Sequence, residues 1–209
     1  YSGSYRDWPK NINLETLADE YSVFIVCPDG DYNSWYFDSP LQKESQYETH
    51  LIKEVIPFVD SLYSTFNSKE GRAICGLSMG GHGAIYLALK HPKLFTAASS
   101  MSGVVDLLFA KERWQVKEKL GEFTADSSLW KNHSVLHKSQ DFINQNIQIL
   151  LDCGVDDFAI PLNRSLHQKM LALKIPHTYI ERPGNHSWEY WTNALPYHLL
   201  FFSNILKKN

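Results

Sequence analysis

The chain has 209 residues, enough for one globular domain with a substantial apolar core. A net charge of −3 argues against a nucleic-acid-binding surface and against one that binds anionic membranes. No apolar run approaches the ~20 residues that a membrane-spanning helix needs, so we expect neither a nucleic acid nor a membrane as partner.

Short apolar runs alternate with longer helical segments along the chain. The first run, 23–27, is β-branched and aromatic and ends at a Pro-Asp-Gly turn, which predicts a buried parallel strand. A helix is expected over 47–66, kinked at Pro57, which lacks an amide hydrogen. Further strands are predicted at 73–76, 95–101, 147–153 and 178–181, and further helices at about 80–91, 160–173 and 194–206, the last with Pro196 in its first turn.

This alternation predicts the α/β class, with a mostly parallel sheet covered by helices on both faces. Segment 104–146 interrupts the rhythm because it is polar, contains two tryptophans and has no clear strand. We interpret it as a mostly helical insertion in a single domain, 1–209. It should lie over the carboxyl edge of the sheet, where ligands bind in such folds.

A G-x-S-x-G motif runs from Gly76 to Gly80 and has Ser78 at its centre. It follows a predicted strand and begins a predicted helix, which is the context of a nucleophile elbow. The alternative is a glycine-rich turn that happens to contain a serine. If Ser78 is the nucleophile, the amide of Met79 at the helix N-terminus is placed to stabilise an oxyanion.

A serine hydroxyl needs a base, and histidine is the usual base near neutral pH. In this class of fold the order along the chain is serine, acid, histidine, with the histidine after the last strand. His186 follows the fifth predicted strand in a Gly/Pro/Asn-rich loop and is the candidate base. His82 is closer to Ser78 in sequence, but it lies on the helix after the elbow, where local packing is the simpler role.

The acid should follow the strand that precedes the strand of His186, where three aspartates occur. Asp152 lies inside the apolar run, whereas Asp156 and Asp157 stand on the loop beyond Gly154. We favour Asp157, with Asp156 as its immediate rival. Asp106, after the third predicted strand, is a lesser alternative.

Aromatic residues flank the candidate site in two segments. Trp35 and Tyr36 lie in one loop, and Trp188 and Trp191 follow His186, so all four are candidates for a flat substrate wall. Aromatic residues are also used heavily in cores, and half or more of these would then serve only in packing. No spacing of histidines, cysteines or acids forms a metal shell, so neither a metal nor a cofactor is expected.

Four segments together resemble one esterase family, which includes tributyrin esterases, S-formylglutathione hydrolases and feruloyl or acetylxylan esterases. They are PDGDYNSWYFDSP, CGLSMGGHGA, LDCGVDDF and ERPGNHSWEYW, in this order from residue 28 to residue 191. The resemblance implies the α/β-hydrolase fold and the second aspartate of GVDD, Asp157, as the acid. Mycolyltransferases share this fold, so acyl transfer to an alcohol is an alternative to hydrolysis.

The resemblance also implies further N-terminal strands, which end in a His-Gly turn whose next amide completes the oxyanion hole. The opening segment YSGSYRDW resembles the part of the family's chain that comes after that turn. We therefore expect the chain to lack those strands, with the second oxyanion donor near Tyr1 or Ser2. The unpaired sheet edge that results favours a homo-oligomer.

The leading prediction is a serine carboxylesterase that acts on short-chain acyl esters or on acetyl or feruloyl esters of the plant cell wall. Its substrate would be a small-molecule or carbohydrate-linked ester. The alternatives are an acyltransferase of the same fold and a non-catalytic binding domain. The compartment is not predicted.

Overall fold

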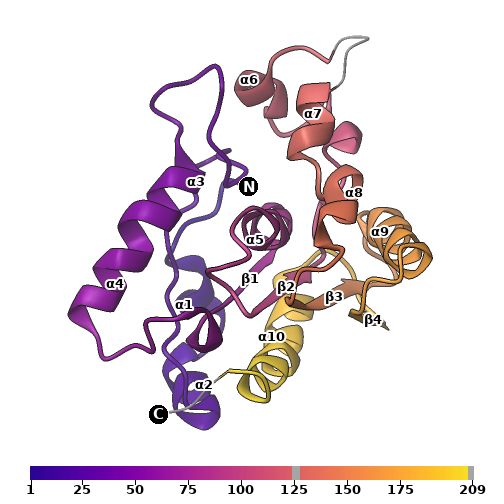
Figure 1. Ribbon diagram of the computed structural model, residues 1–209. Helices are drawn as coiled ribbons and strands as arrows, with labels where there is room; N and C mark the ends of the chain where they lie inside the picture. Colours follow the sequence, from indigo (N-terminus) through magenta and orange to yellow (C-terminus); the bar gives the residue numbers. More distant parts are fainter. Residues whose placement is uncertain (124–127, 207–209) are drawn as a thin grey trace.

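The computed structural model describes residues 1–123 and 128–206. Its centre is a parallel sheet of four strands in the order β1-β2-β3-β4 (Figure 1). The strands are β1 (Ala73–Leu77), β2 (Ala97–Met101), β3 (Gln148–Gly154) and β4 (Thr178–Arg182). The four later strand predictions are thus confirmed to within two residues at each end.

Helices and helical turns make up most of the remaining described chain. On the amino-terminal side of β1 they are α1 (Asp7–Asn11), α2 (Leu14–Tyr21), α3 (Tyr47–Thr49), the π-helix η1 (His50–Val55), α4 (Ile56–Leu62) and η2 (Lys69–Gly71). After β1 come α5 (Met79–Lys90), η3 (Leu107–Ala110), α6 (Val116–Leu120), α7 (Ser128–His133), α8 (Val135–Lys138), η4 (Ser139–Phe142), α9 (Ile160–Ala172) and α10 (Trp188–Ser203). None of the described helices is long and apolar enough to cross a membrane.

Two separate apolar cores cover the two faces of the sheet. Successive side chains of a strand point to opposite faces, and β1 follows this rule: Ile74 packs against one core, and Ala73, Cys75 and Leu77 pack against the other. The first core is built with residues of α5 and α9, and the second with residues of α2 and α10. Figure 1 shows α5 and α10 on opposite sides of the strands, so the predicted α/β class with helices on both faces is confirmed.

The strand predicted at 23–27 is absent, which corrects the sequence analysis. This segment forms no ladder, and Phe24 and Val26 are 64% and 49% exposed. β1 is an edge of the sheet, and no other strand of the described chain pairs with it on that side. A cavity of about 710 Å³ is lined by both 23–27 and β1. A segment becomes part of a sheet through hydrogen bonds to a neighbouring strand. No described strand lies next to 23–27 to supply them, so this apolar run stays outside the sheet.

The helix predicted over 47–66 is confirmed in type, although it ends at Leu62. The π-helical turn η1 immediately precedes α4, and Pro57 occupies the first turn of α4. Because proline has no amide hydrogen to donate to the preceding turn, a local change of helical type at this point is expected.

The last helix, α10, begins at Trp188, six residues before the predicted start. The Ser187 side chain accepts a hydrogen bond from the Tyr190 amide at 3.4 Å and so caps the helix. Pro196 consequently lies inside α10 and not in its first turn, which corrects the prediction.

The described part of 104–146 contains five short helical elements and no strand, from η3 to η4. That this segment is an insertion, and that 1–209 is a single domain, stay predictions.

Candidate active site

Ser78 lies at the sharp turn between β1 and α5. Its backbone angles are φ 53° and ψ −116°, a conformation that residues other than glycine rarely adopt. The turn is tight enough that a Cβ atom at Gly76 would lie 2.3 Å from the carbonyl oxygen of Gly80. The Ser78 amide donates to the Met101 carbonyl at 2.9 Å, which fixes the turn to the end of β2. The hydroxyl is thereby presented at the carboxyl edge of the sheet.

The structure brings Ser78, His186 and Asp157 together from three loops at this edge. His186 Nε2 lies 2.9 Å from Ser78 Oγ, and His186 Nδ1 lies 2.9 Å from each carboxylate oxygen of Asp157. The His186 side chain is 20% exposed, whereas that of Asp157 is 0% exposed. Hydrolysis by a serine nucleophile needs three groups: the nucleophile, a base within hydrogen-bonding reach of it, and an acid that orients the base.

The Asp157 carboxylate is stabilised as an anion although it is buried. Burial alone would raise its pKa, but hydrogen bonds from His186, from the Ala159 amide and from the Ser102 hydroxyl outweigh burial and lower the pKa. The Ala159 amide donates to Asp157 Oδ1 at 2.8 Å. A fixed negative charge beside Nδ1 holds the imidazole in one orientation.

Asp156 lies next to Asp157 in sequence but points elsewhere. Its side chain is exposed, and its amide donates to the Gly184 carbonyl at 2.9 Å. The structure therefore places Asp157, and not Asp156, beside His186.

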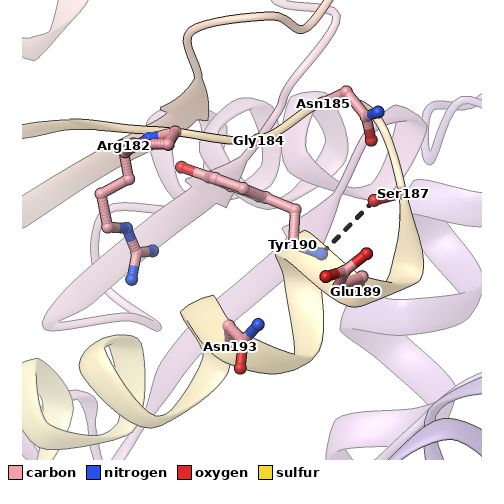
Figure 2. A pocket seen from close by; sticks show the side chains of 8 residues that line it. Arg182, Gly184, Asn185, Ser187, Glu189, Tyr190 and Asn193 are labelled. Atoms are coloured by element: carbon pink, nitrogen blue, oxygen red, sulfur yellow. Dashed lines mark hydrogen bonds between the residues drawn. The ribbon is translucent and has the colours of Figure 1, made fainter.

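The loop that carries His186 is held between β4 and α10. A Cβ atom at Gly154 would lie 2.3 Å from the Gly184 carbonyl oxygen, so the end of β3 and this loop are in close backbone contact. Figure 2 shows the loop and the start of α10, with the Tyr190 amide hydrogen-bonded to the Ser187 hydroxyl. A hollow of about 180 Å³ lies here. It is lined by eight residues that include Arg182, Glu189 and Asn193 and none of the three residues of the candidate site.

Two residues that the sequence analysis missed contact the candidate acid and base. Ser102 directly follows β2, is buried, and helps to lower the pKa of Asp157. Phe158 packs its ring against His186 with 4.4 Å between centroids. The signal for Phe158 was its place directly after Asp157, whereas Ser102 is recognised only once β2 and β3 are paired.

The two predicted oxyanion donors, Met79 and Tyr1, occupy different positions relative to Ser78. Met79 is the first residue of α5, directly after Ser78. Tyr1 and Met79 both line the 710 Å³ cavity, and the Tyr1 hydroxyl donates to Gln115 Oε1 at 3.3 Å. The Ser2 amide donates to the Tyr32 carbonyl at 2.7 Å and is already engaged. The oxyanion role of Met79 and Tyr1 stays a prediction.

The four aromatic residues suggested for a substrate wall differ in position. Trp35 is only 1% exposed and packs against His82, so its ring faces the core. Tyr36 is half-buried, and burial raises its pKa to about 12. Trp188 is also half-buried, whereas Trp191 is buried with its ring edge-to-face against His186 at 4.9 Å.

The other histidine close to Ser78 in sequence, His82, is a core residue. It is fully buried, its Nε2 lies 2.8 Å from the His133 carbonyl, and burial lowers its pKa to about 4. A histidine held neutral in this way serves packing, as the sequence analysis expected of His82.

A second serine, histidine and aspartate meet in the interior. Ser99 Oγ lies 2.7 Å from His198 Nδ1, and His198 Nε2 lies 3.4 Å from Asp152 Oδ2. Asp152 also accepts hydrogen bonds from Tyr190 and Arg182. All three members of this interior set are 0% exposed, so no substrate reaches them.

The described residues contain no group of three or more histidine, cysteine, aspartate or glutamate side chains arranged to hold a metal ion.

Known proteins with similar sequences and folds share this arrangement of elements. An acetyl esterase from Caldicellulosiruptor saccharolyticus is 28% identical over 207 residues, which cover 93% of this chain and 77% of that protein. The solved structure of a ferulic acid esterase matches with a TM-score of 0.80 at 27% identity, covering 98% of this chain and 82% of that one. An S-formylglutathione hydrolase from Staphylococcus aureus matches in fold with a TM-score of 0.85 at 20% identity, covering 98% and 81% of the two chains.

A family model described as "Putative esterase" matches residues 2–202, nearly the whole chain. The fold, a parallel sheet with helices on both faces, is that of the α/β-hydrolases. The chain therefore belongs to this esterase family and is a carboxylic-ester hydrolase.

Proposed function

We propose that Ser78, His186 and Asp157 hydrolyse a carboxylic ester by way of an acyl-enzyme. Ser78 Oγ forms a bond to the ester carbonyl carbon while its proton passes to His186 Nε2. The carbon–oxygen bond to the alcohol then breaks, and His186 returns the proton to the departing alkoxide. The observation that carries this proposal is the 2.9 Å separation of Ser78 Oγ and His186 Nε2, with Asp157 on the opposite ring nitrogen.

Water completes the cycle by the same route in reverse. His186 takes a proton from a water molecule, the hydroxide oxygen bonds to the acyl carbon, and the bond to Ser78 Oγ breaks as the serine regains its proton. The negative oxygen formed in each half is stabilised by the Met79 amide at the start of α5, with a second donor near Tyr1.

The substrates we propose are esters of small acyl groups, acetyl above all, attached to a small molecule or a carbohydrate. The 28% identity to an acetyl esterase over most of both chains supports an acetyl group. The similarity to a ferulic acid esterase structure supports acyl groups that carry an aromatic ring.

The test is hydrolysis of p-nitrophenyl acetate by the wild type, by Ser78→Ala and by Ser64→Ala, whose serine is exposed and remote in sequence from the elbow. We expect release of p-nitrophenol by the wild type and by Ser64→Ala only. A fluorophosphonate reagent should also add once per chain, at Ser78, as measured by peptide mass spectrometry. Hydrolysis that survives in folded Ser78→Ala would show that the nucleophile is another residue.

Transfer of the acyl group to an alcohol is the competing outcome. It is distinguished by adding a sugar or glycerol acceptor and measuring products: free acid in proportion to alcohol released indicates hydrolysis. An acylated acceptor as the main product would replace the hydrolase assignment with that of a transferase.

A further inference from the structure

Phe158 is a large apolar side chain that the fold leaves open to solvent at the candidate site. It is 42% exposed, although its ring lies against that of His186. An exposed aromatic face is costly to hydrate, and one that touches a catalytic base is accessible to whatever that base acts on. Phe158 therefore offers an exposed apolar surface beside His186.

Two further rings extend this surface. Phe109 lies nearly parallel to Phe158, with 6.3 Å between centroids and 10° between planes, and Trp114 lies 5.5 Å from Phe158. Phe109 and Trp114 are themselves 6.1 Å apart and only half-buried. The three rings come from two segments that are distant in sequence, the residues around η3 and the loop after β3, and they form one contiguous cluster.

The cluster is held in place by its surroundings. The Arg113 guanidinium lies 4.5 Å from the centroid of Phe109 and 6.0 Å from that of Trp114, within the range of a cation–π contact. Trp114 has φ 49° and Gln115 has φ 55°, a backbone conformation that non-glycine residues adopt only where the surroundings impose it. Trp114 is further fixed from behind, because Trp35 Nε1 donates to its carbonyl at 3.3 Å.

We infer that Phe109, Trp114 and Phe158 form a subsite that binds a planar aryl ring of the ester substrate. This inference rests on the proposed function of Ser78 and His186. Aromatic pairs gain energy from ring geometry beyond their area of contact, whereas a saturated ring of similar size gains only the area term. The subsite therefore favours an aryl group over its saturated analogue, whether the ring belongs to the acyl part or to the alcohol part of the ester.

The experiment compares matched pairs of esters on the full chain. Methyl benzoate against methyl cyclohexanecarboxylate places the ring on the acyl side, and phenyl acetate against cyclohexyl acetate places it on the alcohol side. For each pair the aryl-to-cyclohexyl ratio of kcat/KM is measured in the wild type, in Phe158→Leu and in Phe123→Leu. Because each ratio is compared between proteins, the intrinsic reactivity of the esters cancels.

In Phe158→Leu the ratio should fall about 3- to 10-fold for one of the two pairs, as expected for the loss of one aromatic contact. The pair that responds identifies the side of the ester on which the ring binds. Phe123 is comparably exposed but packs against Trp130, so Phe123→Leu should keep the wild-type ratios. Unchanged ratios in Phe158→Leu for both pairs would overturn the subsite.

A binding measurement on Ser78→Ala tests the same subsite without changing it. The aryl ester of the responding pair should bind more tightly than its cyclohexyl analogue by calorimetry, and equal affinities would overturn the inference. Failure of the proposed function has a different signature, because no ester would then be hydrolysed in a manner that depends on Ser78.

Discussion

The indole nitrogen of Trp191 donates a buried hydrogen bond to the Ser102 hydroxyl oxygen at 3.1 Å. The same tryptophan presents its ring edge-to-face to His186, and the Ser102 hydroxyl contributes to the lowered pKa of Asp157. Trp191 and Ser102 thus link the surroundings of the candidate base to those of the candidate acid. Both side chains are buried, which makes the arrangement rigid.

Ser102→Ala should lower kcat about tenfold, equivalent to about 1.4 kcal/mol of transition-state stabilisation, with a smaller change in KM. The carboxylate loses one of the donors that keep it ionised and oriented. Steady-state kinetics with p-nitrophenyl acetate measures the effect. Ser100→Ala is the control, because Ser100 lies on β2 two residues before Ser102, is equally buried, and has no hydrogen-bond partner for its hydroxyl among the described residues. An equal loss of kcat in the two variants would contradict a positioning role.

Asp157→Asn should reduce kcat by about 10³- to 10⁴-fold, as the loss of the acid does in a serine–histidine–aspartate site. The amide of asparagine carries no charge to offset that on the imidazole. Asp156→Asn is the matched control because its side chain is exposed, and its rate should stay within about twofold of the wild type. The reverse pattern would assign the acid to Asp156.

Low pH should destabilise the fold in part through Glu48, a buried residue that pairs with Lys90 and His91 at the end of α5. Burial raises the pKa of this carboxyl, but hydrogen bonds from His91 at 2.8 Å and Lys90 at 2.7 Å dominate and lower it to about 2, from an ordinary value of 4.5. A lowered pKa in the folded state means that the stabilisation is complete above pH 4.5 and is lost as the pH falls towards 2.

Denaturant unfolding at pH 5 and pH 3 measures this contribution. The wild type should lose more free energy of unfolding between the two pH values than Glu48→Gln, which has no charge to lose. Glu44→Gln changes an exposed residue on the preceding loop, and this variant should lose as much free energy of unfolding between the two pH values as the wild type. Equal losses in the wild type and Glu48→Gln would contradict the prediction.

The open edge of β1, with the apolar residues of 23–27 beyond it, should promote self-association. Light scattering after size exclusion should show a mass that rises with protein concentration. Val26→Lys should suppress the rise, whereas Leu171→Lys, at a comparably exposed position on α9, should not. A constant monomer mass in the wild type would contradict the expected homo-oligomer.

The parts of the fold that local sequence determines were predicted well. β1 to β4 are short apolar runs next to turns, and α5 and α9 begin where the pattern places them. Segment 23–27 has the same local pattern as β1, yet it forms no strand, because a strand exists only through its neighbour. The local pattern contains no information on whether that neighbour is present.

The candidate site shows the same division. Ser78, His186 and Asp157 were identified from motifs and chain order, and the structure brings them together. Trp35 was a candidate for the substrate wall because of its place in a loop motif, but the structure buries it. The direction in which a ring points depends on the segment that packs over it. Ser102 and the aromatic cluster around Phe158 depend on contacts between distant segments, and single-sequence reasoning does not reach these.

The interior set of Ser99, His198 and Asp152 has a consequence for how such sites are recognised. Among the described residues, a histidine lies between a serine and an aspartate both at the candidate site and in this interior set, so residue types and distances alone do not tell the two apart. In the folded chain the interior set is fully buried, so an ester does not reach it. A serine-directed reagent should therefore react with Ser78 and not with Ser99. The number of serines that react then equals the number of folded molecules in the sample.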